Sequence, residues 1–439
     1  MARDYIERQP ITISEYLKLS RENRRQVTHR ALTKAAQINP VLNSFITILQ
    51  PDPRGTEGSL AFLPLAVKDI FLTKGIRTTA GSKILDRFVP DYDATAVSLL
   101  KMQGAAIVGK TNTHEFAAGA TNLNPHFGAV HNPYDLRRIS GGSSGGSAVS
   151  VASGTSLVAL GSDTGGSVRI PASLCGVIGF KPSYGAISRF GVIPLSWSLD
   201  HVGTLTRNTH DAKLIFEKIL RTDAKDPATT FYRPVKQGEA KLSELTVGVS
   251  SAFQSGCEAG VEQNFLNSVD ALSKAGCRLR RVRIRHFQRI KEVRSVILRS
   301  EMAAYHLATY PGRLESYGED VKKMIETGAD ITAPVYVTAQ RVRSLIAKEI
   351  AELFSELDFL LTPSTRCTAP KIEEAALPST RTELIANTEP FNITGEPAIS
   401  LPNGIVAGLP TGIQLSGPYG SDFELLKVAE MMEELLLSS

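Results

Sequence analysis

The sequence predicts an α/β protein in which helices cover both faces of a β-sheet. Between residues 60 and 180, short apolar stretches alternate with segments whose apolar residues have helical spacing. This alternation is typical of a sheet covered by helices on both faces. The chain has 439 residues, of which 42% are hydrophobic and 21% charged, so it can bury a large core.

The first expected element is a helix near the N-terminus. The segment Thr12-Ile-Ser-Glu15 matches a capping box, and apolar residues continue at helical spacing as far as Asn39-Pro40. Residues 1–50 are therefore interpreted as an N-terminal helical arm. A polar loop, PDPRGTEG, follows the arm, and residues 51–439 are interpreted as one compact unit because neither a repeat nor a composition break divides them.

The compact unit is expected to alternate strands with helices. In its first part, strands are expected at 60–67, 105–109, 157–161 and 177–180, and helices at 94–103, at 146–152 and directly after Gly166. In its second part, strands are expected at 245–249 and 359–362, and helices at 261–275, 290–310, 336–357 and 423–437.

Composition limits the classes of partner and compartment. The net charge of +5 is spread along the chain. In the densest basic run, Cys277–Lys291, apolar residues alternate with arginine as on a strand with one solvated face, so no direct contact with nucleic acid is expected. The four cysteines have no zinc-site spacing and are expected to be free thiols. Without an export signal or an apolar run of ~18 residues, the protein is expected to be soluble and cytoplasmic, with no membrane contact.

Two short motifs suggest chemistry that their surroundings do not support. The segment GAAIVGKT, Gly104–Thr111, fits the phosphate-loop pattern, but its middle residues are themselves the expected strand and a helix precedes it. The segment Gly141–Gly145 fits the serine-hydrolase elbow G-x-S-x-G, but the preceding residues 131–140 are polar and turn-like rather than a strand. Such a hydrolase also needs a histidine downstream of the serine. Each of the four downstream histidines is interpreted as a surface or hydrogen-bonded imidazole: His201, His210, His286 and His306.

A third combination joins distant pieces of the chain. Lys68 ends an apolar strand, Ser143 lies in SGGSSGG, and Ser167 lies between an expected strand and an expected helix, where backbone N–H groups of residues 164–167 could face an oxyanion. Alternation along the strand sends Lys68 and Asp69 to opposite faces. A buried lysine without a carboxylate partner can lose its proton near neutral pH and act as a general base. Taken alone, the loop could be a linker, the lysine a solvated side chain and Ser167 a helix cap.

These pieces resemble the amidase signature family, hydrolases with a Ser, cis-Ser, Lys triad. The resemblance is strongest over residues 140–173, SGGSSGGSAVSVASGTSLVALGSDTGGSVRIPAS, and extends to AVKD, to 109–133, to LSWSLDHVG and to GEPAISLPNG. It implies a single large mixed sheet flanked by helices on both faces, with 51–439 as the amidase signature domain.

The resemblance also implies roles for individual residues. Ser167 would be the nucleophile, Ser143 the cis-serine that relays the proton, and Lys68 the base. Backbone amides of Thr164, Gly165, Gly166 and Ser167 would form the oxyanion hole, braced by Asp163 and Arg169. Ala117, Ala118 and Gly119, together with Ser143, would contact the substrate. The implied reaction converts a small carboxylic amide to a carboxylate and ammonia through a Ser acyl-enzyme, with no metal or cofactor, and a homodimer is possible.

Two functions within this family remain open: a free-standing amidase, and the glutaminase component, or A subunit, of a glutamyl-tRNA(Gln) or aspartyl-tRNA(Asn) amidotransferase. In these glutaminases, as the resemblance implies, an acidic residue shortly before a P-x-N-x-x-G segment and an arginine on an upstream helix bind glutamine. Here the segment is Pro390–Gly395, the equivalent of the acid is Ile385 in one interpretation and Glu383 or Glu389 in others, and Val321 is followed by lysines and Met324. We therefore expect an uncharged acyl chain and a poor glutaminase. A non-enzymatic binding module is disfavoured because all three triad residues are present.

Overall fold

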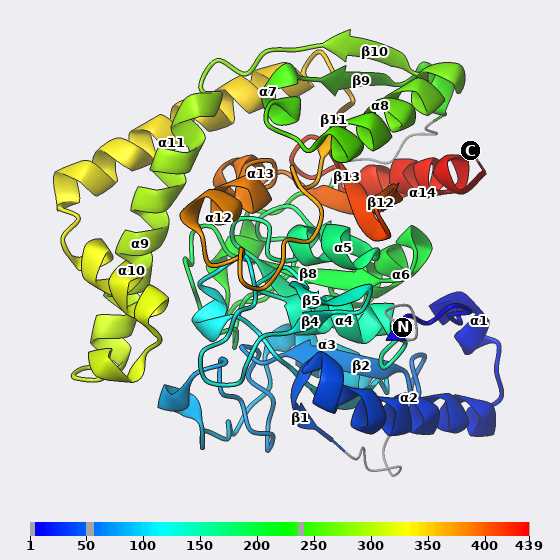
Figure 1. Cartoon of the computed structure of the whole chain (residues 1–439), viewed down its shortest axis with the longest axis vertical. Helices are drawn as coiled ribbons and strands as arrows, with labels where there is room; N and C mark the ends of the chain where they lie inside the picture. Colours follow the sequence, from blue (N-terminus) through cyan, green and yellow to red (C-terminus); the bar gives the residue numbers. More distant parts are fainter. Residues whose placement is uncertain (1–4, 50–56, 236–240, 439) are drawn as a thin grey trace.

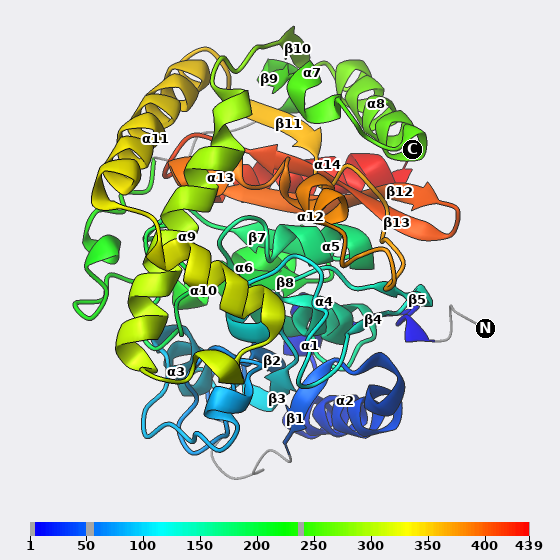
Figure 2. The same cartoon turned by 60° about the vertical axis from the view of Figure 1, so that its left-hand side comes forward.

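The computed structural model describes residues 5–49, 57–235 and 241–438. Within them one sheet of eleven strands runs in the order β1-β3-β2-β6-β8-β7-β12-β13-β11-β9-β10. Its strands are β1 (Phe45–Ile48), β2 (Pro64–Lys68), β3 (Ala106–Thr111), β6 (Val158–Asp163), β7 (Ile178–Lys181), β8 (His201–Thr206), β9 (Thr246–Val249), β10 (Arg278–Arg281), β11 (Phe359–Pro363), β12 (Ala398–Val406) and β13 (Leu409–Ser416). Figures 1 and 2 show β9 and β10 at one end of the sheet and β1–β3 at the other.

The sheet is mixed, as expected. At one end β2 pairs in parallel with β3 and with β6, and at the other β9 pairs in parallel with β10 and β11. The strands between them, from β6 to β11, pair antiparallel. Parallel neighbours need crossover connections, and helices supply them, whereas β12 and β13 are joined by a tight hairpin.

Fourteen α-helices are present in the described residues: α1 (Ile13–Leu17), α2 (Arg21–Leu42), α3 (Thr95–Met102), α4 (Gly145–Ala152), α5 (Arg169–Cys175), α6 (Thr209–Ile219), α7 (Ser251–Gln254), α8 (Ala259–Lys274), α9 (Ile290–Thr309), α10 (Glu319–Ala329), α11 (Ala333–Phe354), α12 (Pro378–Ile385), α13 (Pro390–Thr394) and α14 (Asp422–Ser438). None of the helices in the part of the chain that the structure describes is long and apolar enough to cross a membrane.

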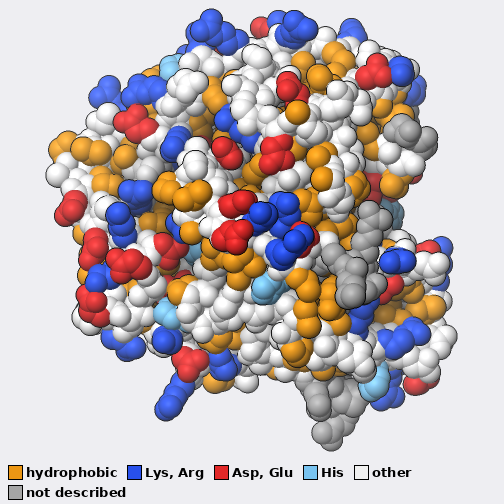
Figure 3. Space-filling view, in the orientation of Figure 1, with side chains coloured by type: hydrophobic (Ala, Val, Ile, Leu, Met, Phe, Trp, Pro, Cys, Tyr) orange, Lys and Arg blue, Asp and Glu red, His pale blue; other side chains and the backbone are white. Residues whose placement is uncertain are grey.

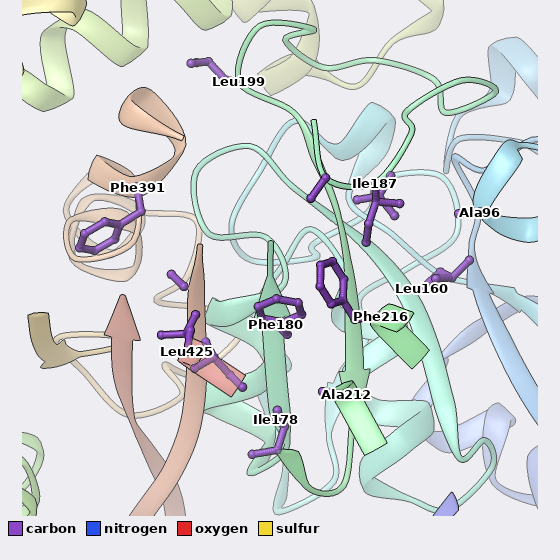
Figure 4. Packing of buried hydrophobic residues seen from close by; sticks show 14 of the residues in the cluster. Ala96, Leu160, Ile178, Phe180, Ile187, Leu199, Ala212, Phe216, Phe391 and Leu425 are labelled. Carbon is purple, nitrogen blue, oxygen red and sulfur yellow. The ribbon is translucent and has the colours of Figure 1, made fainter. Parts of the chain in front are cut away.

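Helices cover both faces of the sheet, which confirms the predicted fold class. Phe180 of β7 packs edge-to-face on Phe216 of α6, with ring centroids 5.3 Å apart (Figure 4). A Cβ atom placed on the preceding residue, Gly179, would instead lie 2.5 Å from the Cβ of Ala172 in α5. Because adjacent strand residues point to opposite faces, α5 and α6 lie on opposite faces of the sheet.

The N-terminal segment differs from the expected single helix. The capping box between Thr12 and Glu15 is present, but α1 ends at Leu17 and α2 begins anew after the cap residue Ser20. Pro40 lies inside the last turn of α2 rather than after its end. Strand β1 then pairs antiparallel with β3, so residues 45–48 belong to the main sheet. The expected loop PDPRGTEG lies largely outside the described residues.

Residues 131–140 also differ from the expected turn. They form a separate two-stranded antiparallel sheet of β4 (His131–Asn132) and β5 (Asp135–Ile139). This hairpin ends directly before the loop that carries Ser143, and Ser140 donates its backbone N–H back to Val130 at 3.3 Å. A polar composition conceals such a hairpin because both its strands are short and partly exposed.

Three helices form an outer layer on one side of the molecule. Helices α10 and α11 both pack on α9, and α12 and α13 lie between α9 and the sheet (Figure 1). Acidic and basic side chains are interspersed on the surface seen in Figure 3 rather than separated into fields of one sign.

Candidate active site

The site begins at the carboxyl ends of two neighbouring parallel strands. In the register of β2 and β6, Val67 lies opposite Leu160, so both strands end at the same edge of the sheet. Lys68 is the last residue of β2 and is fully buried. Its Nζ donates hydrogen bonds to Ser143 Oγ at 2.7 Å and to Ser162 Oγ at 2.9 Å. The parallel pairing therefore brings a lysine and two serines from separate segments together.

Asp69 points to the other face of the sheet, as the strand alternation predicted. Its carboxylate lies 3.1 Å from the ammonium group of Lys110 and accepts a hydrogen bond from the backbone N–H of Thr79 at 2.8 Å. Lys110 is the lysine of the motif GAAIVGKT, and it is buried within β3. This confirms that the motif is part of a strand rather than a phosphate loop.

Among the residues that the structure describes, Lys68 therefore has hydroxyl partners and no carboxylate in direct contact. Burial lowers the pKa of Lys68 to about 7, and the more distant negative charges of Asp163 and Asp200 oppose that effect. An ordinary lysine is almost wholly protonated at neutral pH, whereas this one is divided between its two forms. A neutral amine hydrogen-bonded to a serine can accept that serine's proton.

The loop that carries Ser143 is fixed by the surrounding backbone. The peptide bond between Gly142 and Ser143 is cis, which agrees with the family resemblance. The carbonyl of Ser143 accepts a hydrogen bond from Thr113 Oγ1 at 2.9 Å, and the backbone N–H of Ser144 donates to the carbonyl of Ser167 at 3.1 Å. A Cβ atom on Gly146 would lie 2.3 Å from the carbonyl oxygen of Ser44, so the chain requires glycine there.

Ser167 lies in the turn between β6 and α5, and its side chain lines a cavity although the residue is only 8% exposed. The carboxylate of Asp163 shapes this turn by accepting the backbone N–H groups of Gly166 at 2.8 Å and Val168 at 3.1 Å. The N–H groups of Gly165 and Ser167 donate to no other residue that the structure describes. Gly166 thus differs from its expected part in the oxyanion hole, because Asp163 already occupies its amide.

Arg169 braces Asp163 from behind, as the sequence indicated. Its Nη2 lies 2.8 Å from Asp163 Oδ1, and its Nη1 donates to Gln414 Oε1 at 2.6 Å, while Asn392 also donates to Asp163 Oδ1 at 2.8 Å. Burial alone would raise the pKa of Asp163, but the neighbouring guanidinium of Arg169 holds it well below its usual range. These hydrogen bonds and the ion pair therefore connect four elements under the Ser167 turn: β6, α5, α13 and β13.

A cavity of about 460 Å³ opens beside Ser167. Its lining includes the backbone segment from Ala117 to Ala120, as expected for 117–119, and the turn residues Thr164, Gly165 and Ser167. Ser143 and Gly166 do not line it. Of Lys68, Ser143 and Ser167, only Ser167 lines this cavity.

The opposite wall of the cavity is more polar than the sequence suggested. Ile385 lines it, as one interpretation of the sequence requires, but so do Arg294 of α9 and Glu389, whose side chains form an ion pair. Lys323 and Met324 of α10 line it as well. Glu389 directly precedes Pro390, and only the tertiary fold shows that Arg294 is its partner.

None of the four downstream histidines lines this cavity. The buried His201 has its Nδ1 2.7 Å from the carbonyl of Leu199, and the buried His306 has its Nδ1 2.9 Å from the hydroxyl of Tyr317. His210 and His286 pair with glutamates near the surface. All four are thus accounted for by local partners.

The sequence did not indicate two further residues, one that contacts Lys68 and one that contacts the Ser167 turn. Ser162, which accepts a hydrogen bond from Lys68, precedes the recognised turn and is hidden in the strand sequence ALGSD. Asp200 accepts a hydrogen bond from Thr164 Oγ1 at 2.6 Å, and burial raises its pKa to about 6. Asp200 lies in LSWSLDHVG, one of the segments that carry the family resemblance.

Comparison with known proteins agrees with this architecture. The family described as Amidase matches residues 26–426. The chain therefore belongs to the amidase family and is a hydrolase of that family.

Among curated proteins, the chain is 36% identical to the A subunit of glutamyl-tRNA(Gln) amidotransferase from Thermotoga maritima, covering 97% of this chain and 95% of that protein. It is 38% identical to the protein of the same name from Listeria innocua, over 85% of this chain and 84% of that protein.

Solved structures show the same fold. The Thermotoga maritima amidotransferase protein superimposes with a TM-score of 0.87 at 35% identity, covering 98% of this chain and 96% of that one. A structure described as an amidase has a TM-score of 0.86 at 33% identity, covering 97% and 99% of the two chains. The 6-aminohexanoate cyclic dimer hydrolase has a TM-score of 0.88 at 26% identity, covering 98% and 97%.

Proposed function

We propose that this protein hydrolyses a carboxylic amide through an acyl-enzyme on Ser167, with Ser143 as proton relay and Lys68 as general base. One observation carries the proposal: a fully buried lysine, without a carboxylate in contact, donates at 2.7 Å to the hydroxyl of Ser143. Such a lysine has no evident structural purpose, because burying its charged form costs several kcal/mol. It has a chemical purpose if its neutral form removes a proton.

The proposed reaction starts from neutral Lys68. Its Nζ takes the proton of Ser143 Oγ while Ser143 Oγ takes the proton of Ser167 Oγ, and the Ser167 oxygen forms a bond to the amide carbonyl carbon. The carbon–nitrogen bond then breaks as the nitrogen receives a proton back through Ser143. Water attacks the resulting ester by the same relay, releasing the carboxylate and restoring Ser167.

Backbone amides would stabilise the tetrahedral intermediate. Thr164, Gly165 and Ser167 lie in the turn before α5 and line the cavity, so we assign the oxyanion hole to their N–H groups. Loss of one such donor typically costs ~3 kcal/mol of transition-state stabilisation. We assign Gly166 a different part, in which its amide holds Asp163 and thereby the shape of the turn.

The amide itself has two candidates. The relatives named as A subunits of glutamyl-tRNA(Gln) amidotransferase cover nearly the whole chain and favour glutamine, hydrolysed as part of a complex, over the free small amide expected from the sequence. The presence of Ile385, Lys323 and Met324 in the cavity lining favours a free-standing amidase, for which the similar structure described as an amidase is a precedent. No metal or cofactor takes part in either scheme.

Ammonia release by the purified chain tests this proposal. We expect hydrolysis of at least one of glutamine, butyramide, benzamide and succinamate, and we expect Ser167→Ala to abolish it. Glutamine hydrolysis that requires both a partner protein and tRNA would establish the amidotransferase function, and efficient hydrolysis of simple amides by the chain alone would establish the amidase. Persistence of activity in Ser167→Ala would refute the assignment of the nucleophile.

A further inference from the structure

The solvent side of the cavity is formed by three helices outside the sheet. Lining residues close to the reaction centre, such as Ser167 and Ala117, are buried. The lining residues Lys291 of α9, Lys323 of α10 and Pro378 of α12 are exposed instead. These three residues mark the mouth of the cavity, through which a substrate passes to reach Ser167.

Two polar contacts connect α12 to the other two helices at this mouth. Arg381 of α12 has its Nη2 3.2 Å from Oδ2 of Asp320 in α10. Thr382 of α12 accepts a hydrogen bond through its Oγ1 from Nζ of Lys291 in α9 at 3.2 Å. All four residues line the cavity. Movement of α12 away from α9 and α10 would therefore widen the mouth.

The packing of α12 itself leaves it free to move. Of the eight side chains that the structure describes in α12, only that of Leu384 is buried. A segment with so few buried apolar contacts opens at a low cost in free energy. The chain on either side is fixed, because Ala375 is fully buried and the side-chain amide of Asn387 donates to two backbone carbonyls, both at 3.0 Å. Movement is thus confined to residues 376–386.

The two members of the ion pair are held to different degrees. Asp320 is fixed from below, because its Oδ2 also lies 2.9 Å from Nε2 of the fully buried His114. Among the residues that the structure describes, the guanidinium of Arg381 contacts Asp320 alone, and its Nε is buried without a partner. An ion pair between partly exposed side chains contributes little free energy, so thermal motion breaks it. The pair therefore opens by release of Arg381.

We propose that Arg381 determines the size of the amides that the enzyme accepts, because its contact with Asp320 holds residues 376–386 against the mouth and excludes bulky acyl groups. The inference rests on the proposed function. The cavity of about 460 Å³ is large enough for a drug-sized ligand, so the mouth and not the interior sets the limit. A bulky amide then binds only the fraction of molecules in which the pair is open, which reduces its apparent affinity by that fraction.

The test compares two uncharged amides, butyramide and 4-phenylbutyramide. We expect Arg381→Met to raise kcat/KM for 4-phenylbutyramide about fivefold, equivalent to about 1 kcal/mol, through a lower KM, and to change that for butyramide less than about twofold. Arg381→Lys keeps the charge and should keep most of the wild-type selectivity.

Salt gives a readout that a merely structural role would not move. Neither amide is charged, so ionic strength acts only through the protein. Raising NaCl from about 20 to about 500 mM should increase the wild-type kcat/KM for 4-phenylbutyramide and leave that of Arg381→Met unchanged, because salt screens the ion pair. A wild-type value that is insensitive to salt would contradict the role of the pair.

Lys322→Met is the matched control. Lys322 lies on α10 beside the cavity but does not line it, and its Nζ forms an ion pair with Glu315 at 2.6 Å. Its loss should leave the selectivity at the wild-type value. A selectivity that stays unchanged in Arg381→Met, or that changes equally in Lys322→Met, would overturn the assignment of Arg381.

Hydrogen exchange separates this inference from the proposed function, since it needs no turnover. Amide hydrogens of residues 376–386 should exchange faster in Arg381→Met than in the wild type, while those of α13 stay unchanged. Equal exchange of residues 376–386 in the two proteins overturns the inference. Failure of the wild type to hydrolyse either amide or any other, with the faster exchange still present in Arg381→Met, refutes the amidase function and leaves the movable edge of the mouth intact.

Discussion

The buried lysine leads to a quantitative prediction about pH. A lysine whose pKa falls from 10.5 to about 7 has lost roughly 5 kcal/mol of preference for its charged form. At pH 7 about half of the Lys68 side chains are then neutral, whereas only about one lysine in a few thousand would be neutral at the ordinary value. Burial thus accounts for about three orders of magnitude in the concentration of active base.

The neutral form of Lys68 increases as pH rises, so activity must rise too. We expect kcat/KM to increase tenfold per pH unit up to a midpoint near 7 and then to level off, measured from pH 5 to 9 with a buffer series of constant ionic strength. Ser162→Ala removes an oxygen that accepts from the lysine at 2.9 Å, so the midpoint should move down by up to about one unit. A kcat/KM that stays constant from pH 5 to 7, or a midpoint that does not move in Ser162→Ala, would refute this role of Lys68.

The same lysine should lower stability. Between pH 7 and 10.5 the unfolded chain binds a proton at this position and the folded protein does not, so the free energy of unfolding should rise with pH across that window. Lys68→Met abolishes the burial cost and should be inactive yet more stable than the wild type at pH 6, by up to a few kcal/mol in urea unfolding. A Lys68→Met protein less stable than the wild type at pH 6 would contradict this account.

Three further outcomes follow from the site. Ser143→Ala should lose nearly all turnover while its circular dichroism and unfolding midpoint stay close to wild type, since its neighbours are held through backbone groups; turnover above a tenth of wild type would exclude the relay. Asp163→Asn leaves the buried guanidinium of Arg169 without its carboxylate and should cost about 3–5 kcal/mol in urea unfolding; a change below 1 kcal/mol would show that the brace is dispensable. Dialysis against EDTA should leave kcat unchanged, and a loss that added zinc restores would contradict the metal-free scheme.

Local patterns predicted the centre of the site because its parts lie at the ends of strands. Lys68 ends a wholly apolar strand and Ser167 follows another, and parallel strands that are neighbours in the sheet end at the same edge. The opposite direction of Asp69 needed only the alternation of strand residues. These inferences depend on short-range periodicity, which a single sequence displays.

The cavity wall could not be predicted in the same way. Arg294 and Glu389 are 95 positions apart and meet only because α9 lies against α12 and α13. Neither residue breaks the pattern of its own segment, since a charged residue on an amphipathic helix is ordinarily solvated. The sequence did not predict strands β12 and β13 either, because Pro402, Pro410 and several glycines interrupt their apolar pattern.

The two walls of the cavity are formed by different parts of the chain. The turn that carries Ser167 is anchored in the central strands, whereas most of the facing wall belongs to α9, α10 and α12, which lie outside the sheet (Figure 2). Residues of these three helices can therefore be exchanged without disturbing the hydrogen bonds of Lys68, Ser143 and Asp163. A chain built in this way is a convenient starting point for engineering: a library confined to the inward-facing positions of three helices would sample new acyl groups while every member inherited the same reaction centre.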